Sequence, residues 1–154
     1  MKNKQSLYKW LYETYENDLF SYGIAFGISK ELLEDAIHDV FLHLYEREHK
    51  LWESQNMKFY LLNCLKNRIR TIKKKEMNTE FLEEGSDNYS FLIEVNGFEL
   101  IDEEKERAAM QKQLKKMLDS LTDRQREAVY LRYTQGLSYE EIGKLRSEER
   151  RVGK

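Results

Sequence analysis

The chain contains no proline, and only seven of its 154 residues are glycine. Proline breaks helix interiors and glycine weakens them, so little in this sequence interrupts a helix. Long apolar runs are also missing: no stretch approaches the ~20 apolar residues that span a bilayer, and the N-terminus lacks the apolar core of a signal peptide. We therefore expect an all-α protein that stays in the cytoplasm and does not insert into membranes.

Residues suited to catalysis or metal binding are scarce. The single cysteine, Cys64, permits no internal disulfide, which suits a reducing compartment. His38, His43 and His49 are five and six residues apart, a spacing that does not bring imidazoles onto one helix face. The sequence has no glycine-rich phosphate loop and no recognisable nucleophile and base. We therefore expect no metal, no cofactor and no enzymatic activity.

Charge is unevenly distributed, although the formal net charge is only −2. Seven basic residues and no acidic one lie between Lys58 and Lys75, whereas ten acidic residues and no basic one lie between Glu76 and Glu104. This pattern indicates two surfaces with different partners, and the basic one favours a polyanion. The alternative is that the basic stretch is only the solvated face of a helix.

Apolar residues in the first half of the chain recur every three or four positions, which predicts three amphipathic helices. The first covers residues from about 5 to 26, the second follows the N-cap candidate Ser29, and the third continues to Ile72. Their expected buried sides comprise Leu7, Leu11, Tyr15, Leu19, Tyr22 and Phe26, then Leu33, Ile37, Val40, Phe41 and Leu44, then Phe59, Leu62, Leu65, Ile69 and Ile72.

The periodicity fades from Glu76 to about Asp102, where EEGSDNYS and NGF supply turn-forming residues and predict a linker. An apolar stripe then returns at Ala109, Leu114, Met117, Leu118 and Leu121, which predicts another amphipathic helix.

Two capping boxes mark the last predicted helices. Thr122 with Gln125 predicts a helix that begins at Asp123, and Gly136 is well placed to end it. The second box, Ser138-Tyr-Glu-Glu141, predicts a helix that begins at the next residue and extends at least to Leu145.

Three stretches carry a resemblance to a known family: LYETYENDLFSYGIAFGISKELLEDAIHDVFLHLYE, FYLLNCLKNRIR and LDSLTDRQREAVYLRYTQGLSYEEIGKL. Their most specific pieces are the Glu34-Asp35 pair with Phe41 six residues after Asp35, and the run from RQRE to YEEI. In this order and spacing they resemble the extracytoplasmic-function group of bacterial sigma-70-family sigma factors, over almost everything from Leu7 to Leu145.

The resemblance implies two small helical domains joined by an acidic linker. A region 2-like domain that binds core polymerase and the minus-ten element covers residues 1–75, the linker covers 76–104, and an incomplete region 4-like helix-turn-helix domain covers 105–145. In the family the linker threads the polymerase channel that later carries RNA. An acidic linker suits that channel as a polyanion mimic, and the alternative is that its charge only keeps it soluble and extended.

The resemblance also assigns binding residues. In the family the second helix docks on the coiled coil of the largest polymerase subunit, and the matching polar face here has Glu34, Asp35, His38 and Asp39. The family's third helix and the loop before it melt the minus-ten element and hold unpaired bases. The matching DNA-binding candidates are Asn56, Phe59, Tyr60, Asn63, Lys66, Asn67, Arg68, Arg70, Lys73, Lys74 and Lys75. Aromatic rings suit unpaired bases and the cations suit phosphates.

The last residues depart from the family pattern. In the family, the helix that matches the one starting at Tyr139 precedes a recognition helix for the minus-thirty-five element. That recognition helix is absent here, so we expect Ile142 and Leu145 to lack a covering partner. RSEERRVGK also resembles one reading frame of an adapter used for short-read sequencing libraries. We therefore expect residues 146–154 not to be native. The alternative is a genuine charged tail that extends the last helix.

The predicted function is that of a sigma factor, which directs bacterial RNA polymerase to promoters and assists promoter melting. Core polymerase and promoter DNA are the expected partners, and an anti-sigma factor is a further candidate. One alternative is a truncated polymerase-binding decoy, or another helix-turn-helix regulator without initiation activity. A second is a nucleic-acid enzyme that clamps its substrate with the basic helix, which the lack of clustered catalytic carboxylates disfavours.

Overall fold

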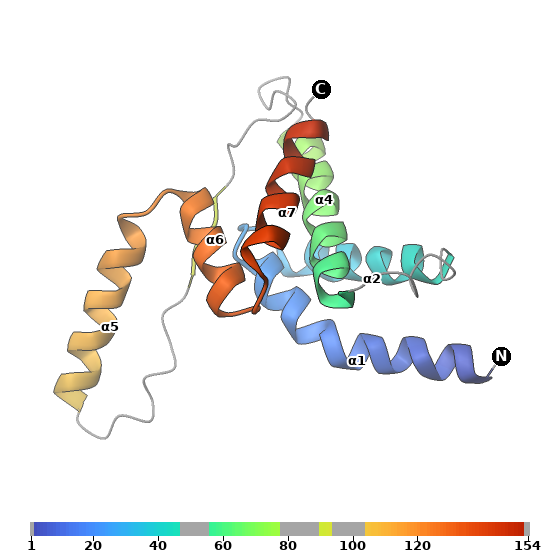
Figure 1. Ribbon diagram of the computed structural model, residues 1–154, viewed down its shortest axis with the longest axis horizontal. Helices are drawn as coiled ribbons and strands as arrows, with labels where there is room; N and C mark the ends of the chain where they lie inside the picture. The colour runs from blue at the N-terminus through green and yellow to red at the C-terminus, as the bar shows by residue number, and fades with distance from the viewer. Residues whose placement is uncertain (1, 47–55, 78–89, 94–103, 153–154) are drawn as a thin grey trace.

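The computed structural model describes residues 2–46, 56–77, 90–93 and 104–152, and all regular structure in these ranges is helical (Figure 1). The helices are α1 Lys2–Ile24, α2 Lys30–Glu46, α4 Met57–Met77, α5 Glu104–Asp119, α6 Asp123–Tyr133 and α7 Tyr139–Val152. The all-α prediction is confirmed. Most of the predicted acidic linker lies outside the described ranges, as do His49 and residues 153–154. Within them, no helix has the length and apolar character to cross a membrane.

The predicted caps form at three helix starts. Ser29 Oγ accepts a hydrogen bond from the backbone of Leu32 at 3.3 Å at the start of α2. Thr122 and Gln125 make a reciprocal capping box at the start of α6. At α7, Ser138 Oγ accepts from the Glu141 backbone N–H at 3.1 Å, and the Glu141 carboxylate accepts from the Ser138 N–H at 2.9 Å. Each box satisfies N–H groups that a helix start leaves without an internal partner.

Two glycines shape the ends of helices. Gly136 has a φ of 72° just beyond α6, a conformation that side chains with a Cβ rarely adopt, and it turns the chain toward α7 as predicted. Gly23, near the end of α1, allows a close approach of α2: a Cβ built there would lie 2.3 Å from Leu33 Cδ1.

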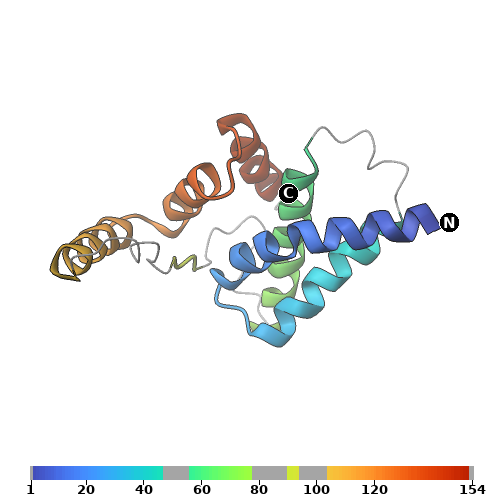
Figure 2. The ribbon, with the colours of Figure 1, turned by 90° about the horizontal axis from the view of Figure 1, so that it is seen from below.

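Helices α1, α2 and α4 pack against one another, with α1 and α2 side by side and α4 crossing them (Figure 2). The buried sides predicted for these helices are confirmed. All of the predicted residues are buried except Leu7, Tyr15, Phe59 and Ile72, which are half-buried and still pack against the core.

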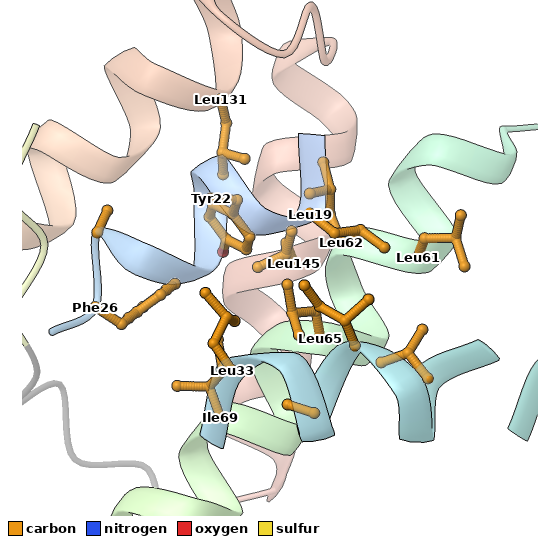
Figure 3. Packing of buried hydrophobic residues seen from close by; sticks show 14 of the residues in the cluster. Leu19, Tyr22, Phe26, Leu33, Leu61, Leu62, Leu65, Ile69, Leu131 and Leu145 are labelled. Atoms are coloured by element: carbon orange, nitrogen blue, oxygen red, sulfur yellow. The ribbon is translucent and has the colours of Figure 1, made fainter. Parts of the chain in front are cut away.

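Helices α6 and α7 share this core instead of forming a separate one. Leu131, Ile142 and Leu145 belong to the same buried cluster as residues of α1, α2 and α4, and Figure 3 shows Leu145 among Leu19, Leu62 and Leu65. The expectation that Ile142 and Leu145 lack a covering partner is therefore wrong: they are 6% and 1% exposed, and α7 packs against α4. The division into two domains stays a prediction.

In contrast, most of α5 extends away from the other helices (Figure 1), and the helix has no buried residue. Its predicted apolar stripe is only half-buried at Leu114 and Leu118, and Met117 is 60% exposed.

A buried ion pair joins α4 to α6. Lys66 Nζ lies 3.0 Å from Glu127 Oε2 and donates to Oε1 at 3.1 Å, and the two side chains are only 1% and 3% exposed. The Tyr22 hydroxyl, from α1, donates to the same carboxylate. Removing two charges from water costs several kcal/mol per ion, which is offset only where geometry is good and the remaining hydrogen-bonding sites are satisfied. Three helices therefore meet at one carboxylate.

A second polar contact lies beside this pair. The hydroxyls of Ser21 on α1 and Tyr130 on α6 are 2.7 Å apart, and Gln135 Nε2 donates to the Tyr130 oxygen at 2.8 Å. Burial raises the pKa of the Tyr130 hydroxyl above its usual value, although the hydrogen bonds with Ser21 and Gln135 act in the opposite direction. This hydroxyl therefore stays protonated and can bridge the two helices.

Removing one member of the ion pair should destabilise the protein strongly. Glu127→Ala leaves the Lys66 ammonium buried without its counter-ion, and we expect a loss of about 3–5 kcal/mol in the free energy of unfolding, measured by urea titration with circular dichroism. The double variant Lys66→Met with Glu127→Leu removes both charges and should lose far less. Equal losses in the single and double variants would contradict this account of the pair.

Substitution of the two helical glycines should have opposite effects. Gly23→Ala forces a methyl group into Leu33 in a packed core, so we expect a loss of about 1–3 kcal/mol. Gly143→Ala on α7 is the matched control: no atom lies within 4 Å of the added Cβ, so it should gain about 0.5–1 kcal/mol from helix propensity. Thermal unfolding of both variants measures the difference, and a stabilised Gly23→Ala would contradict the close approach.

Candidate polymerase and nucleic-acid interface

The polar face of α2 presents the four residues predicted to bind polymerase. Glu34, Asp35 and His38 are exposed. Asp39 is half-buried, and its carboxylate forms an ion pair of 2.9 Å with Arg68 on α4. Their spacing places all four residues on one side of the helix. The outer residues are therefore available to a partner, whereas Asp39 also holds a cation of the neighbouring helix.

An open groove of about 510 Å³ runs between α2 and α4. Asp39 and His43 line one wall, and Asn67, Arg68 and Thr71 line the other. The acidic side of α2 and the basic side of α4 thus border a single depression. Within the described ranges, no group of three or more His, Cys, Asp or Glu side chains is arranged to hold a metal ion.

The predicted DNA-binding residues of α4 differ in exposure. Asn67 and Lys75 are exposed, whereas Arg68, Arg70, Lys73 and Lys74 are half-buried, as are Phe59, Tyr60 and Asn63. Phe59 and Tyr60 also pack against the core. Their rings are therefore only partly open to a base, and the outward side of α4 is mainly polar and cationic.

Two of the predicted phosphate contacts point inward. Lys66 is buried with Glu127, as described above. Lys73 Nζ donates to the backbone carbonyl of Phe26, beyond the end of α1. In this structure both ammonium groups hold helices together. A sequence-based count of cations on a helix cannot make this distinction, because the acceptors come from distant parts of the chain.

Asn56 has two structural roles that the sequence analysis missed. Its Oδ1 accepts a hydrogen bond from the Phe59 backbone N–H at 3.2 Å and so caps α4. Its Nδ2 donates to Glu141 Oε2 on α7 at 2.6 Å. The cap was recognisable, because asparagine is a preferred N-cap residue and directly precedes an amphipathic stretch. The contact with α7 had no local signal.

The electrostatics of Glu141 reflect these contacts. Partial burial alone would raise the pKa of its carboxyl group, but hydrogen bonds from the Ser138 backbone, Asn56 and the Ser138 side chain, together with nearby Lys144, lower the pKa below its usual value. The side chain is therefore held as a carboxylate, which accepts hydrogen bonds from both its own capping box and the start of α4.

The turn between α6 and α7 is fixed by Arg132. Its guanidinium group lies 4.3 Å from the centroid of the Tyr139 ring and donates to the carbonyl of Leu137 at 3.1 Å. A cation over an aromatic face is attracted by the ring quadrupole. Together with Gly136 and the Ser138 cap, this contact stabilises the turn between the two helices.

Comparison with known families identifies this unit. Residues 111–146 match the family model described as Sigma-70, region 4, which covers the second part of α5, all of α6 and the start of α7. No curated protein and no solved structure matches the chain. The α6–turn–α7 unit therefore matches a sigma-70 region 4, and the resemblance of this chain to the sigma-70 family is confirmed in that segment.

Proposed function

We propose that this chain is a sigma factor of the extracytoplasmic-function group, which recruits core RNA polymerase to promoters and assists strand opening. The observation that carries the proposal is the region 4 match, which implies interaction with polymerase and promoter DNA. A region 2-like domain over residues 1–75 and a region 4-like domain over 105–145 are part of the proposal. Such a protein acts in the cytoplasm and leaves phosphodiester chemistry to the polymerase.

The α2 face supports a role in polymerase binding. Glu34 and Asp35 are exposed carboxylates on the helix that resembles the family's polymerase-binding helix. Acidic groups suit a basic partner surface, and complementary charges of this kind steer association and exclude wrong partners. The proposal therefore assigns the initial contact with the largest subunit to this face.

The outward side of α4 supports a role in holding opened DNA. Separating strands costs a few kcal/mol per extruded base, so the protein must offer contacts that only unpaired bases can use. Tyr60 and Asn63 are half-buried at the edge of the core and offer stacking and hydrogen bonds. Lys74 and Lys75 follow on the same helix and suit the phosphates of the separated strand.

Charge reversal on α2 tests the polymerase contact. We expect the variant Glu34→Lys with Asp35→Lys to bind matched core polymerase at least about tenfold more weakly, because it sets like charges against a basic surface. Fluorescence anisotropy of the labelled chain measures binding, and Glu13→Lys, at an exposed position of α1, is the control.

Run-off transcription then tests initiation itself. Stimulation of specific transcripts by the chain supports the sigma-factor proposal. Competition with another sigma factor for core polymerase, without any transcript, favours the polymerase-binding decoy instead. Undiminished polymerase binding by the charge-reversed variant would contradict the role given to α2.

Substitutions on α4 should separate phosphate binding from stacking. Lys74→Ala with Lys75→Ala should weaken binding of single-stranded minus-ten DNA and reduce the slope of log affinity against log salt by about 0.7 for each phosphate that is no longer neutralised. Tyr60→Ala should cost about 1–3 kcal/mol and leave the slope unchanged. Lys9→Ala, at an exposed position of α1, is the control for general charge. An unchanged slope in the double lysine variant would contradict the phosphate role.

A further inference from the structure

Helices α6 and α7 lie against α1 and α4, and this contact covers two residues that the sequence predicts to bind DNA. Lys66 is 1% exposed beneath α6. Asn56, at the start of α4, is bonded to Glu141 on α7. Both belong to the predicted DNA-binding set, so nucleic acid cannot reach them by the expected route while α6 and α7 occupy this position.

Glu127 occupies the place that a phosphate would take at Lys66. Its carboxylate, like a phosphate, presents anionic oxygens, and both of its oxygens lie close to the Lys66 ammonium, at 3.1 Å and 3.0 Å. An ammonium buried to this extent cannot meet a second anion of that size from outside. Contact with Glu127 and contact with nucleic acid are therefore mutually exclusive for Lys66.

Phe91, which lies in no helix, fills the centre of this contact. Phe91 comes from the chain between α4 and α5 and is fully buried. Its ring centroid lies 5.1 Å from that of Phe26 and 5.8 Å from that of Tyr22, both in the α1 region, and 5.5 Å from that of Tyr130 on α6. The ring thus touches both sides of the contact at once.

The backbone around Phe91 is also bonded to both sides. The Phe91 N–H donates to Asp123 Oδ1 at 2.9 Å, and its carbonyl accepts from the Arg126 guanidinium at 2.5 Å, both at the start of α6. The next residue, Leu92, donates its N–H to the Ala25 carbonyl at 2.9 Å. Two consecutive residues therefore connect α6 to the turn after α1.

We propose that Phe91, together with the backbone of Leu92, is an intramolecular latch, which holds α6 and α7 against α1 and α4 and withholds Lys66 from outside partners. The ion pair and the hydrogen bonds of this contact can be exchanged for bonds to water or phosphate when it opens. The Phe91 ring has no such replacement, since it loses its apolar surroundings. The position of Phe91 therefore sets the balance between a closed and an open chain.

Acylation of lysines by an amine-reactive reagent, followed by mass spectrometry, measures the latch in the free chain. In the unaltered protein Lys66 should react at least about tenfold more slowly than Lys75, which is exposed on the same helix, because it reacts only when the contact opens. Phe91→Ala should bring the two rates within about threefold of each other. Leu92→Ala is the matched control: this neighbour is 63% exposed, and its backbone bond persists.

A second variant tests the latch independently, in case Phe91→Ala unfolds the whole protein. Asp123→Ala removes the acceptor of the Phe91 N–H at a partly exposed position, and it should raise the rate at Lys66 while helical circular dichroism stays unchanged. Equal rates at Lys66 and Lys75 in the unaltered protein would overturn the latch. So would an unchanged Lys66 rate in both the Phe91 and Asp123 variants, or an equal increase in the Leu92 control.

The biological meaning of the latch rests on the proposed function, and the two can fail separately. If Lys66 is protected and Phe91→Ala exposes it, the latch stands, whatever the chain binds. Binding of core polymerase and of single-stranded minus-ten DNA is then measured on the same variants. Absence of both in every variant overturns the proposed function alone. Tighter DNA binding by Phe91→Ala than by Leu92→Ala supports the latch and the function together.

Discussion

The burial of one carboxylate constrains how the helices are arranged. Glu127 can lie away from water only where the Lys66 ammonium and the Tyr22 hydroxyl both reach it, and these groups belong to two other helices. A buried pair of this kind is weak evidence for stability, because desolvation cancels much of the attraction. Its stronger effect is on geometry: α6 can be rotated or shifted only by leaving a charge unpaired. The position of α6 relative to α1 and α4 follows from this constraint.

Features that depend on neighbouring residues could be predicted from the sequence. The capping boxes at Thr122 and Ser138 act over three residues, and the positive φ at Gly136 follows from the turn that separates two helices. The buried faces of α1, α2 and α4 follow from helical periodicity. For the same reason the outward carboxylates of α2 were predictable, since their exposure depends only on the helix and its apolar side.

Features that depend on distant residues could not be predicted from the sequence. Lys66 and Glu127 are 61 positions apart, and Asn56 and Glu141 are 85 apart. Nothing near Lys66 distinguishes it from the cations that remain on the surface of α4. Phe91 lies in an acidic stretch whose composition predicts a linker, yet its ring is fully buried because three aromatic rings from other segments surround it. In each case the deciding partner is supplied by the tertiary structure.

The same logic explains why one part of the chain can cover another. The ammonium and amide donors on α4 and at its start can be satisfied by any surface with well-placed carboxylates. Glu127 and Glu141 supply such carboxylates to Lys66 and Asn56. A surface with carboxylates at these positions is therefore suited to cover the donor side of α4 and its first turn.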